Sequence, residues 1–178
     1  IKNEDMLDAV IDHLLDQMGP ADYKLRETHE YTLALPTDYY GPGSFDKWIR
    51  VGWALANTSP KMFVTWLKMS CQENCRHTLA KSGKFDWSRS VQDMYELWKG
   101  FDCSGSASGL SHRSIMYWCK RDAFDKYQVI HKNTIDFFID ETINDATEFD
   151  LASVLFNIFK DRFVCVSIRN NCWYEYSN

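Results

Sequence analysis

One cluster in this 178-residue chain combines cysteine and histidine in a way that raises the question of a metal site. The segment Cys71-x-x-x-Cys75-x-His77 has the side-chain types that bind zinc. It lacks the short Cys-x-x-Cys pair of zinc knuckles, and no second ligand pair follows nearby. Asp136 and Asp140 are spaced by one helical turn, but a solvated helix end explains these carboxylates better. We therefore predict no metal site.

Patterns for nucleotide chemistry are also missing from the sequence. The run 81–85 (KSGKF) lacks both the leading glycine and the hydroxyl after the lysine that a phosphate-binding loop requires. No Asp-x-Asp pair on a predicted strand is available to hold two metals for nucleotidyl transfer. His112 has no Ser or Cys nucleophile placed against it, and at the start of a helix it is better explained as a phosphate contact or plain surface. We predict no catalytic residue and no cofactor within these residues.

Cations beside aromatic residues form the pattern that most favours a function. Arg50 lies three residues before Trp53, Arg113 precedes the pair Tyr117-Trp118, and Lys120-Arg121 follows that pair. Single-stranded nucleic acid is held by this combination, because cations track the phosphates while aromatic rings stack on the bases. The candidate nucleic-acid-binding residues are Lys47, Arg50, Trp53, Arg113, Lys120, Arg121, Lys126 and Tyr127.

The competing explanation for the tryptophans is that they are core residues. Tryptophan at helical spacing more commonly packs in a core than stacks on a base, and this applies to Trp48, Trp66, Trp98 and Trp118. Trp53 falls at the edge of an apolar helix face, so the sequence leaves both roles open for it.

Charge is distributed unevenly along the chain. The net charge of −5 argues against a general nucleic-acid binder. Residues 1–46 hold three Lys/Arg against ten Asp/Glu, residues 47–132 hold fourteen against seven, and residues 133–178 hold three against eight. The basic centre between acidic ends favours a positive surface in the middle of the chain, although uneven solvated faces can also arise by chance.

Apolar residues that recur every three or four positions predict six to eight helices. The expected helices cover 6–18, 45–57, 60–70, 72–81, 86–99, 111–122, 123–143 and 150–159. Ser44, Ser59, Ser111 and Asp150 are the predicted helix caps. Residues 21–43 show no period, so we expect irregular chain there. Gly52 lowers helix propensity, and its presence predicts that another helix crosses closely at that point.

The last third of the chain contains the first strand patterns. Two β-rich runs, 163–168 and 173–176, flank the turn residues Asn170-Asn171 and predict a hairpin. The predicted fold class is mainly α, a helical bundle with a short C-terminal β-hairpin. The predicted domains are a helical domain at 1–145 and the start of a following connector at 146–178. No run approaches 18 consecutive apolar residues, so no membrane span is predicted.

Several features predict a piece of a longer protein from a reducing compartment. The chain starts at Ile1 without an initiator methionine, and it stops inside an aromatic run. We therefore expect the terminal hairpin to pack poorly because its downstream partner is missing. Six cysteines are too sparse for a disulfide scaffold, which favours a reducing environment.

The tryptophan motifs occur in an order that resembles a known module. An aromatic-Trp-Val-Gly-Ala-Leu run at 45–55 is followed by Phe63-x-x-Trp66-x-x-x-Ser70, a lone Trp98, and Gly-Leu-Ser at 109–111 before a helix. This order resembles the type 2 primase C-terminal domain, which follows the catalytic domain in many viral and plasmid primases. The resemblance spans about residues 3–120.

The tail extends the likeness to one group of viral proteins. Residues 122–127 (DAFDKY), 160–166 (KDRFVCV) and 173–176 (WYEY) look like the connector of poxvirus-type primase–helicases of nucleocytoplasmic large DNA viruses, with the mimivirus kind most similar. In that architecture an archaeo-eukaryotic primase domain comes first and a hexameric superfamily 3 helicase comes last. The resemblance implies that this chain is the middle part.

The resemblance implies a non-catalytic domain that binds single-stranded template or primer and couples primase to helicase in viral DNA replication. The parent chain would be a primase and an NTP-dependent helicase that uses Mg and ATP, with hydrolase activity and hexamer formation through its helicase. Its expected location is a replication site in the host cytoplasm. The alternative is a spacer that docks on the adjoining domains without touching nucleic acid. A third option, an independent enzyme, has little support in the sequence.

Overall fold

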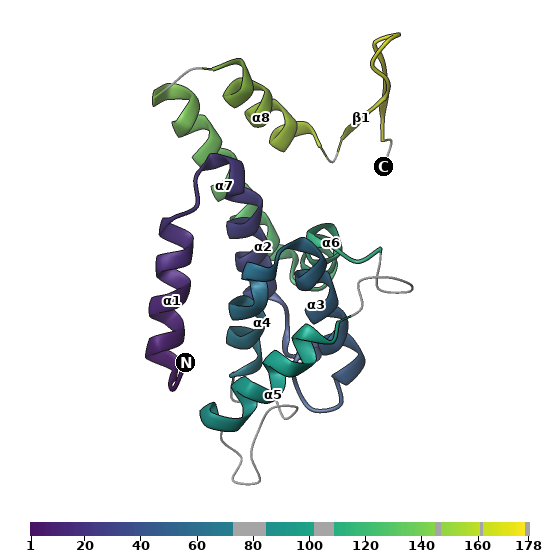
Figure 1. The fold of residues 1–178 in the computed structure, drawn as a ribbon. Coiled ribbons are helices and arrows are strands. Elements are labelled where there is room, and N and C mark those ends of the chain that lie inside the picture. The colour runs from purple at the N-terminus through teal and green to yellow at the C-terminus, as the bar shows by residue number, and fades with distance from the viewer. Residues whose placement is uncertain (73–84, 102–108, 145–146, 161, 177–178) are drawn as a thin grey trace. The chain divides into compact units, whose positions relative to one another are not determined.

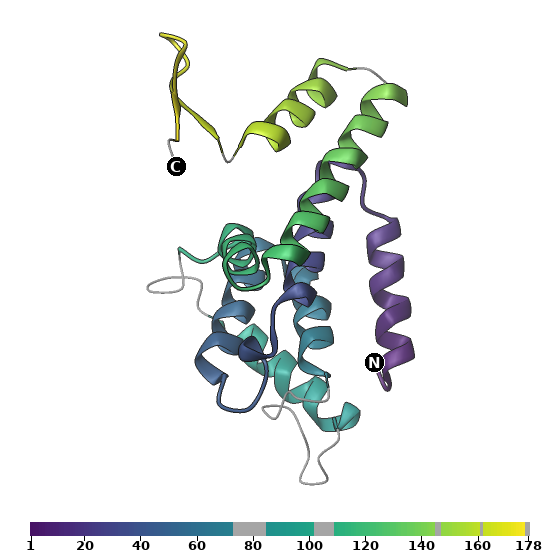
Figure 2. The same ribbon diagram turned by 180° about the vertical axis from the view of Figure 1, so that it is seen from behind.

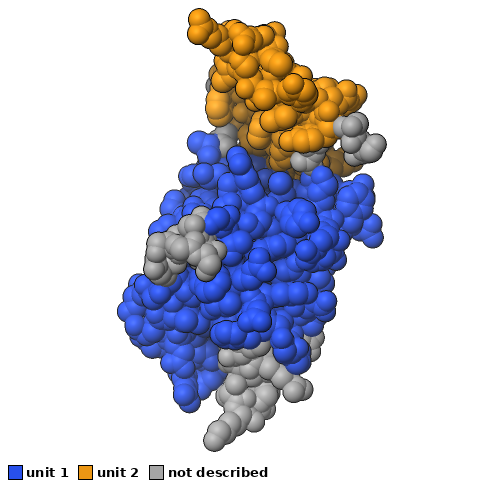
Figure 3. Space-filling view, turned by 90° about the vertical axis from the view of Figure 1, so that its right-hand side faces the viewer, with its two compact units in different colours: residues 1–128 blue, residues 129–178 orange. Residues whose placement is uncertain are grey.

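The computed structural model describes residues 1–72, 85–101, 109–144, 147–160 and 162–176. These residues divide into two compact units, 1–128 and 129–178, which Figure 3 colours separately. The division falls inside one helix, so the predicted domain boundary near residue 145 stays a prediction. The predicted helix at 72–81 and most of the predicted loop at 100–109 lie outside the described residues.

The described residues form eight α-helices and one β-hairpin, which confirms the mainly α fold with a short C-terminal hairpin (Figure 1). The helices are α1 Glu4–Asp16, α2 Tyr23–Ala34, α3 Phe45–Thr58, α4 Phe63–Ser70, α5 Trp87–Lys99, α6 His112–Asp122, α7 Phe124–Asn144 and α8 Glu148–Phe159. The strands are β1 Phe163–Ser167 and β2 Cys172–Glu175, and short 3-10 turns lie at Pro20–Asp22, Thr37–Tyr39 and Pro60–Met62. None of the described helices is both long and apolar enough to cross a membrane.

Helix α4 is at the centre of the first unit. Helices α2 and α3 each pack on α4 and on α6, while α1 and α5 both pack on α4 (Figures 1 and 2). The α1 contact is reinforced by Lys68 of α4, whose Nζ lies 2.7 Å from Glu4 Oε1 and 2.6 Å from Asp8 Oδ1. Because several helices pack on α4, its own side chains decide how the unit is assembled.

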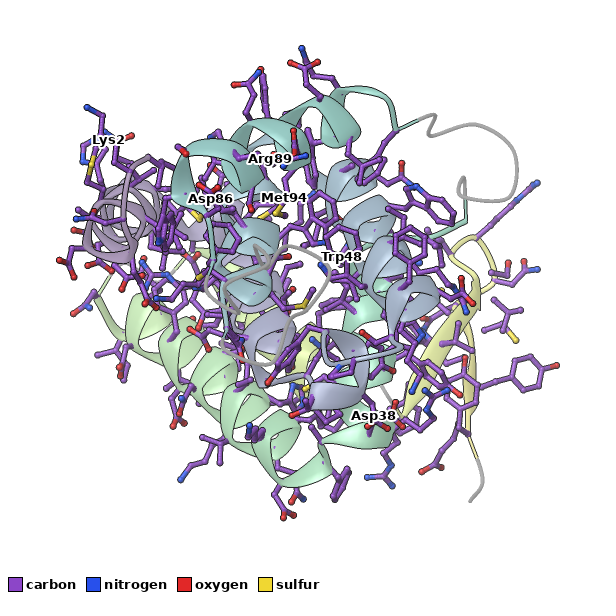
Figure 4. The ribbon with its side chains drawn as sticks, turned by 90° about the horizontal axis from the view of Figure 1, so that it is seen from below. Lys2, Asp38, Trp48, Asp86, Arg89 and Met94 are labelled. Atoms are coloured by element: carbon purple, nitrogen blue, oxygen red, sulfur yellow. The ribbon has the colours of Figure 1, made fainter. Side chains whose placement is uncertain are left out.

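Two tryptophans and a serine join α3 to α4. The Trp48 and Trp66 ring centroids are 4.6 Å apart, and Trp48 lies among the helices in Figure 4. Trp48 Nε1 donates to Ser70 Oγ at 2.8 Å, Ser70 Oγ donates to Trp66 O at 2.7 Å, and Trp66 Nε1 donates to Trp48 O at 3.3 Å. Buried indole N–H groups need such partners. The predicted core role of these tryptophans, and of Ser70 on the buried stripe, is confirmed.

Gly52 marks the close crossing that the sequence predicts. A Cβ atom built at this position would lie 2.9 Å from Trp66 Cε2 and 3.1 Å from Phe101 Cε2. Real Cβ atoms do not come so close to ring carbons, so a side chain here would push the Trp66 ring out of its place. Glycine at this position therefore allows α3 and α4 to pack at their observed separation.

The prediction of irregular chain at 21–43 is wrong for its first half, because Tyr23–Ala34 forms helix α2. Seven of its twelve residues are buried, including Thr28, His29 and Thr32. The two threonine hydroxyls donate to carbonyls one turn earlier, Lys24 O and Thr28 O. Because polar residues also occupy the buried positions of this helix, its sequence lacks the amphipathic period.

Two of the four predicted caps are confirmed. Ser111 caps α6 in a reciprocal capping box with Ser114, and Ser59 accepts from Lys61 N at the start of the turn before α4. Ser44 precedes α3, but its hydroxyl donates to Gly41 O and does not cap the helix. The prediction for Asp150 is wrong, because Thr147 is the cap of α8 and Asp150 is its capping-box partner.

The second unit contains α8 and the predicted hairpin. Phe163 pairs with Glu175 and Cys165 with Trp173, and a bulge follows before Ser167. Asn171 in the turn has a φ of 48°, as the Asn-Asn pair predicts. All four residues of β2 and two of the five residues of β1 are exposed.

Replacing Gly52 with alanine is expected to lower the free energy of unfolding by about 1–3 kcal/mol, because the new methyl group overlaps the Trp66 ring. Thermal or urea unfolding measures the change. Gly19→Ala is the matched control, since a Cβ there meets nothing within 4 Å. Equal stability of the two variants would show that the α3–α4 crossing tolerates a side chain.

His29 makes stability depend on pH. Its Nδ1 lies 2.9 Å from Thr65 Oγ1, and burial, with the charges of Arg26 and Lys68, lowers its pKa from 6.5 to about 4. The native state therefore binds fewer protons than the unfolded state between these values. The contribution of His29 to the free energy of unfolding should be fully present above pH 6.5. It should fall by about 1.4 kcal/mol per pH unit as the pH decreases toward 4. Urea titrations from pH 7 to 4.5 measure this slope, and it should flatten in His29→Gln.

Candidate nucleic-acid interface

Helices α3 and α6 bring part of the predicted site together. Lys47 and Arg50 lie on α3, and Trp118 and Arg121 lie on α6, which packs on α3. Tyr39, in the turn before α3, lies between the two sets, with its ring centroid 5.9 Å from that of Trp118. We call the set of Tyr39, Lys47, Arg50, Trp118, Arg121 and Asp122 the α3–α6 cluster.

The two α3 cations lie over the rings of this cluster. Lys47 Nζ is 5.0 Å from the Tyr39 ring centroid, and Arg50 Cζ is 5.5 Å from the Trp118 ring. Both rings are nearly inaccessible, with 2% of Tyr39 and 8% of Trp118 exposed. The rings therefore belong to the core, and each supports a cation whose charged end lies at the surface.

Asp122 joins Arg121 to Tyr39. Arg121 donates from Nε to Asp122 Oδ1 at 2.7 Å and from Nη2 to Oδ2 at 2.6 Å. Tyr39 Oη donates to Asp122 Oδ2 at 2.5 Å and accepts from Arg121 Nη2 at 3.1 Å. The hydrogen bonds from Arg121, with the smaller contribution of Tyr39, lower the pKa of Asp122 from 3.8 to about 2. Asp122 is therefore a fixed negative charge inside the cluster at neutral pH.

The other predicted residues lie outside the cluster. Arg113 is exposed in the first turn of α6, about 12 Å along the helix axis from Arg121. Trp53 is half-buried and contacts Phe101 edge-on, with ring centroids 6.5 Å apart. Lys126 is exposed in the first turn of α7. The structure therefore gathers three of the six predicted cations, Lys47, Arg50 and Arg121.

Lys120 and Tyr127 form a separate pair next to the cluster. Lys120 Nζ lies 5.4 Å from the Tyr127 ring centroid. Tyr127 is 3% exposed and stacks on Tyr31, with centroids 5.4 Å apart and planes at 17°. A ring buried to this degree cannot stack on a base. Tyr127 instead packs against the charged end of Lys120.

Sequence reasoning missed Tyr39, Asp38 and Asp122. Asp38 Oδ2 lies 3.8 Å from Lys47 Nζ, and both side chains are well exposed; Figure 4 shows Asp38 at the outer edge of the helices. The direct succession of Asp122 after Lys120-Arg121 was visible in the sequence. Tyr39 gave no such indication, because its contacts on α6, Trp118, Arg121 and Asp122, lie about 80 residues away in the chain.

The cations of the cluster differ in their ion pairs. Lys47 pairs with Asp38 and Arg121 with Asp122, whereas Arg50 makes no ion pair within the described residues and lies over the Trp118 ring. On α5, by contrast, the ion pairs Arg89–Asp93 and Lys99–Glu96 engage both cations. A guanidinium without a carboxylate partner has its N–H groups available for phosphate oxygens.

Among the residues described, no group of three or more His, Cys, Asp or Glu side chains is placed to hold a metal ion. Cys71 is half-buried, and burial raises the pKa of its thiol to about 11. Cys75 and His77 of the same sequence motif lie outside the described residues.

Two kinds of viral protein are similar to this chain. A protein described as a helicase of Acanthamoeba polyphaga mimivirus is 25% identical over 148 residues, which cover 83% of this chain and 13% of the relative. A protein described as a primase of African swine fever virus is 27% identical over 178 aligned positions, which cover 94% of this chain and 17% of the relative. No protein-family model matches the chain.

These relatives fit the primase–helicase of large DNA viruses that the tryptophan and tail motifs predict. The chain spans less than a fifth of the length of each relative. The predicted domain boundaries stay a prediction.

Replacing Arg121 with alanine should raise the pKa of Asp122 from about 2 toward 3.8, because the two hydrogen bonds from the guanidinium are the main cause of the shift. Carbon-detected NMR of the Asp122 carboxyl group during a pH titration measures this value. Tyr39→Phe removes only one hydrogen bond and should give a smaller rise. An Asp122 pKa that starts near 3.8 in the unmodified chain would contradict the network.

Proposed function

We propose that this chain is the part of a viral DNA primase–helicase that holds single-stranded template or primer and couples the primase to the helicase. The observation that carries the proposal is the α3–α6 cluster, where Lys47 and Arg50 are held over core rings at the surface. Ordered cations lose little side-chain entropy when they bind phosphate. The similarity to viral proteins described as a helicase and a primase supports the same role.

Under this proposal, the catalytic activities of the longer protein are located in its other domains. Primer synthesis and NTP hydrolysis, each with Mg and nucleotide, would be carried out by adjoining primase and helicase domains. The helicase domain would also form the hexamer, and the protein would act at a viral replication site in the host cytoplasm. The residues of this chain contribute template contacts and no catalytic group.

A second candidate function, docking on another protein domain, is favoured by the second unit. Its helix α8 is apolar on most sides, and Phe149 and Phe156 are more than 60% exposed. In the hairpin, Ile168 is 90% exposed and Trp173 is 58% exposed. Large exposed apolar side chains in this density mark protein contacts. The adjoining helicase domain is the partner we propose for this surface.

Reversing both α3 cations, Lys47→Glu with Arg50→Glu, should weaken the binding of single-stranded DNA by about tenfold or more. The reason is that phosphate contacts are lost and repulsion replaces them. The measurement is fluorescence anisotropy of a labelled oligothymidylate at 50 and 200 mM salt. The affinity of the unmodified chain should fall with salt, and that dependence should become weaker in the variant.

The matched control is Arg89→Glu with Lys99→Glu on α5, which makes the same change in net charge at two exposed ion-paired cations. Its affinity should stay close to that of the unmodified chain. Equal losses in both variants would indicate a net-charge effect and no local site. Absence of binding at low salt in the unmodified chain would leave docking as the better function.

A further inference from the structure

The rings inside the α3–α6 cluster cannot stack on bases. Tyr39, Trp118 and the adjacent Tyr127 are each less than 9% exposed. Lys47, Arg50 and Lys120, respectively, lie over them at 5.0–5.5 Å. Stacking on a nucleotide base needs an accessible ring face. Any contact with bases must therefore come from other aromatic side chains beside these cations.

Tyr117 has the required exposure and position. Its side chain is 58% exposed on α6, one turn before Arg121. Arg121 Cζ lies 5.7 Å from the Tyr117 ring centroid, and the same guanidinium is fixed by Asp122 and Tyr39. The ring is thus next to a guanidinium of the cluster while most of its surface remains in contact with solvent.

Phe124 offers a second ring at the start of α7. It is 51% exposed and stacks on the buried Tyr127, with centroids 6.3 Å apart and planes at 20°. Tyr127 is also the ring that Lys120 contacts, so Phe124 and Lys120 pack on the same buried side chain. Contact with a buried ring restricts the orientation of Phe124, which lowers the entropy lost when a base stacks on it.

Tyr95 on α5 shows why exposure alone is insufficient. It is 47% exposed, and Lys99 Nζ lies 5.2 Å from its ring centroid. However, Lys99 is paired with Glu96 at 2.7 Å, and the neighbouring Arg89 is paired with Asp93. Arg121 is likewise paired with Asp122, but the α3–α6 cluster also holds Arg50, which makes no ion pair within the described residues. The ring on α5 has no such cation beside it among these contacts, so it is not expected to bind DNA.

We infer that Tyr117 and Phe124 are base-stacking residues for single-stranded DNA, with the cations of the α3–α6 cluster and Lys120 contacting its phosphates. The inference rests on the proposed function and adds the contact to bases. Stacking requires unpaired bases, so the site selects single strands over duplex. It tolerates different base sequences, because every base has a ring face.

The test compares oligothymidylate with an abasic strand of equal length, using the 178-residue chain and the anisotropy measurement. The unmodified chain should bind the base-bearing strand more tightly. Tyr117→Ala and Phe124→Ala should each weaken that binding by about five- to a hundred-fold and leave binding of the abasic strand nearly unchanged. Tyr117→Phe and Phe124→Tyr should restore the preference, and Tyr95→Ala should have no effect.

The outcomes separate this inference from the proposed function. If both alanine variants keep the affinity for oligothymidylate while the Lys47/Arg50 reversal loses it, base stacking at these rings is wrong and phosphate binding stands. If the unmodified chain binds neither strand, both are overturned. Thermal unfolding excludes misfolding as the cause of a loss: it should stay cooperative in both alanine variants, with little change in Tyr117→Ala and a modest decrease in Phe124→Ala, which loses its contact with Tyr127.

Discussion

The contact of Trp48 with Trp66 is the interaction on which the rest of the first unit depends. Two indoles buried 4.6 Å apart bring α3 and α4 together, and Ser70 accepts the hydrogen bond that the Trp48 indole would otherwise lack. The arrangement requires Gly52, because any side chain there would overlap the Trp66 ring. Since α1, α2 and α5 all pack on α4, the position of this ring pair affects where each of these helices packs.

The same packing determines which residues reach the surface. With Trp48 and Leu55 committed to the core, the opposite side of α3 presents Lys47 and Arg50. On α6 the burial of Ile115, Trp118 and Cys119 leaves Tyr117 and Arg121 exposed. The candidate interface is thus formed by the solvent-facing sides of α3 and α6, whose opposite sides pack in the core. Its cations lie over buried rings, which gives them defined positions that isolated surface lysines and arginines lack.

The two units have surfaces of different chemical character. The first exposes the cations of the α3–α6 cluster, Lys47, Arg50 and Arg121, whose side chains are of the kind that binds phosphate oxygens. The second exposes phenylalanine, isoleucine and tryptophan side chains, which suit a protein surface. The two proposed roles use different residues, so nucleic-acid binding and docking are compatible with each other in this chain.

The amphipathic helices, the caps at Ser59 and Ser111, the close approach at Gly52 and the hairpin could be predicted from the sequence, because each leaves a pattern in residues near in the chain. Helix α2 could not, because polar residues such as Thr28 and His29 are buried in it and interrupt the apolar period that makes a helix recognisable. The sequence shows that the cations lie in the middle of the chain, but the residues that contact them depend on the tertiary structure. Tyr39 meets Asp122 across 83 positions, and only the packing of α3 on α6 brings them into contact.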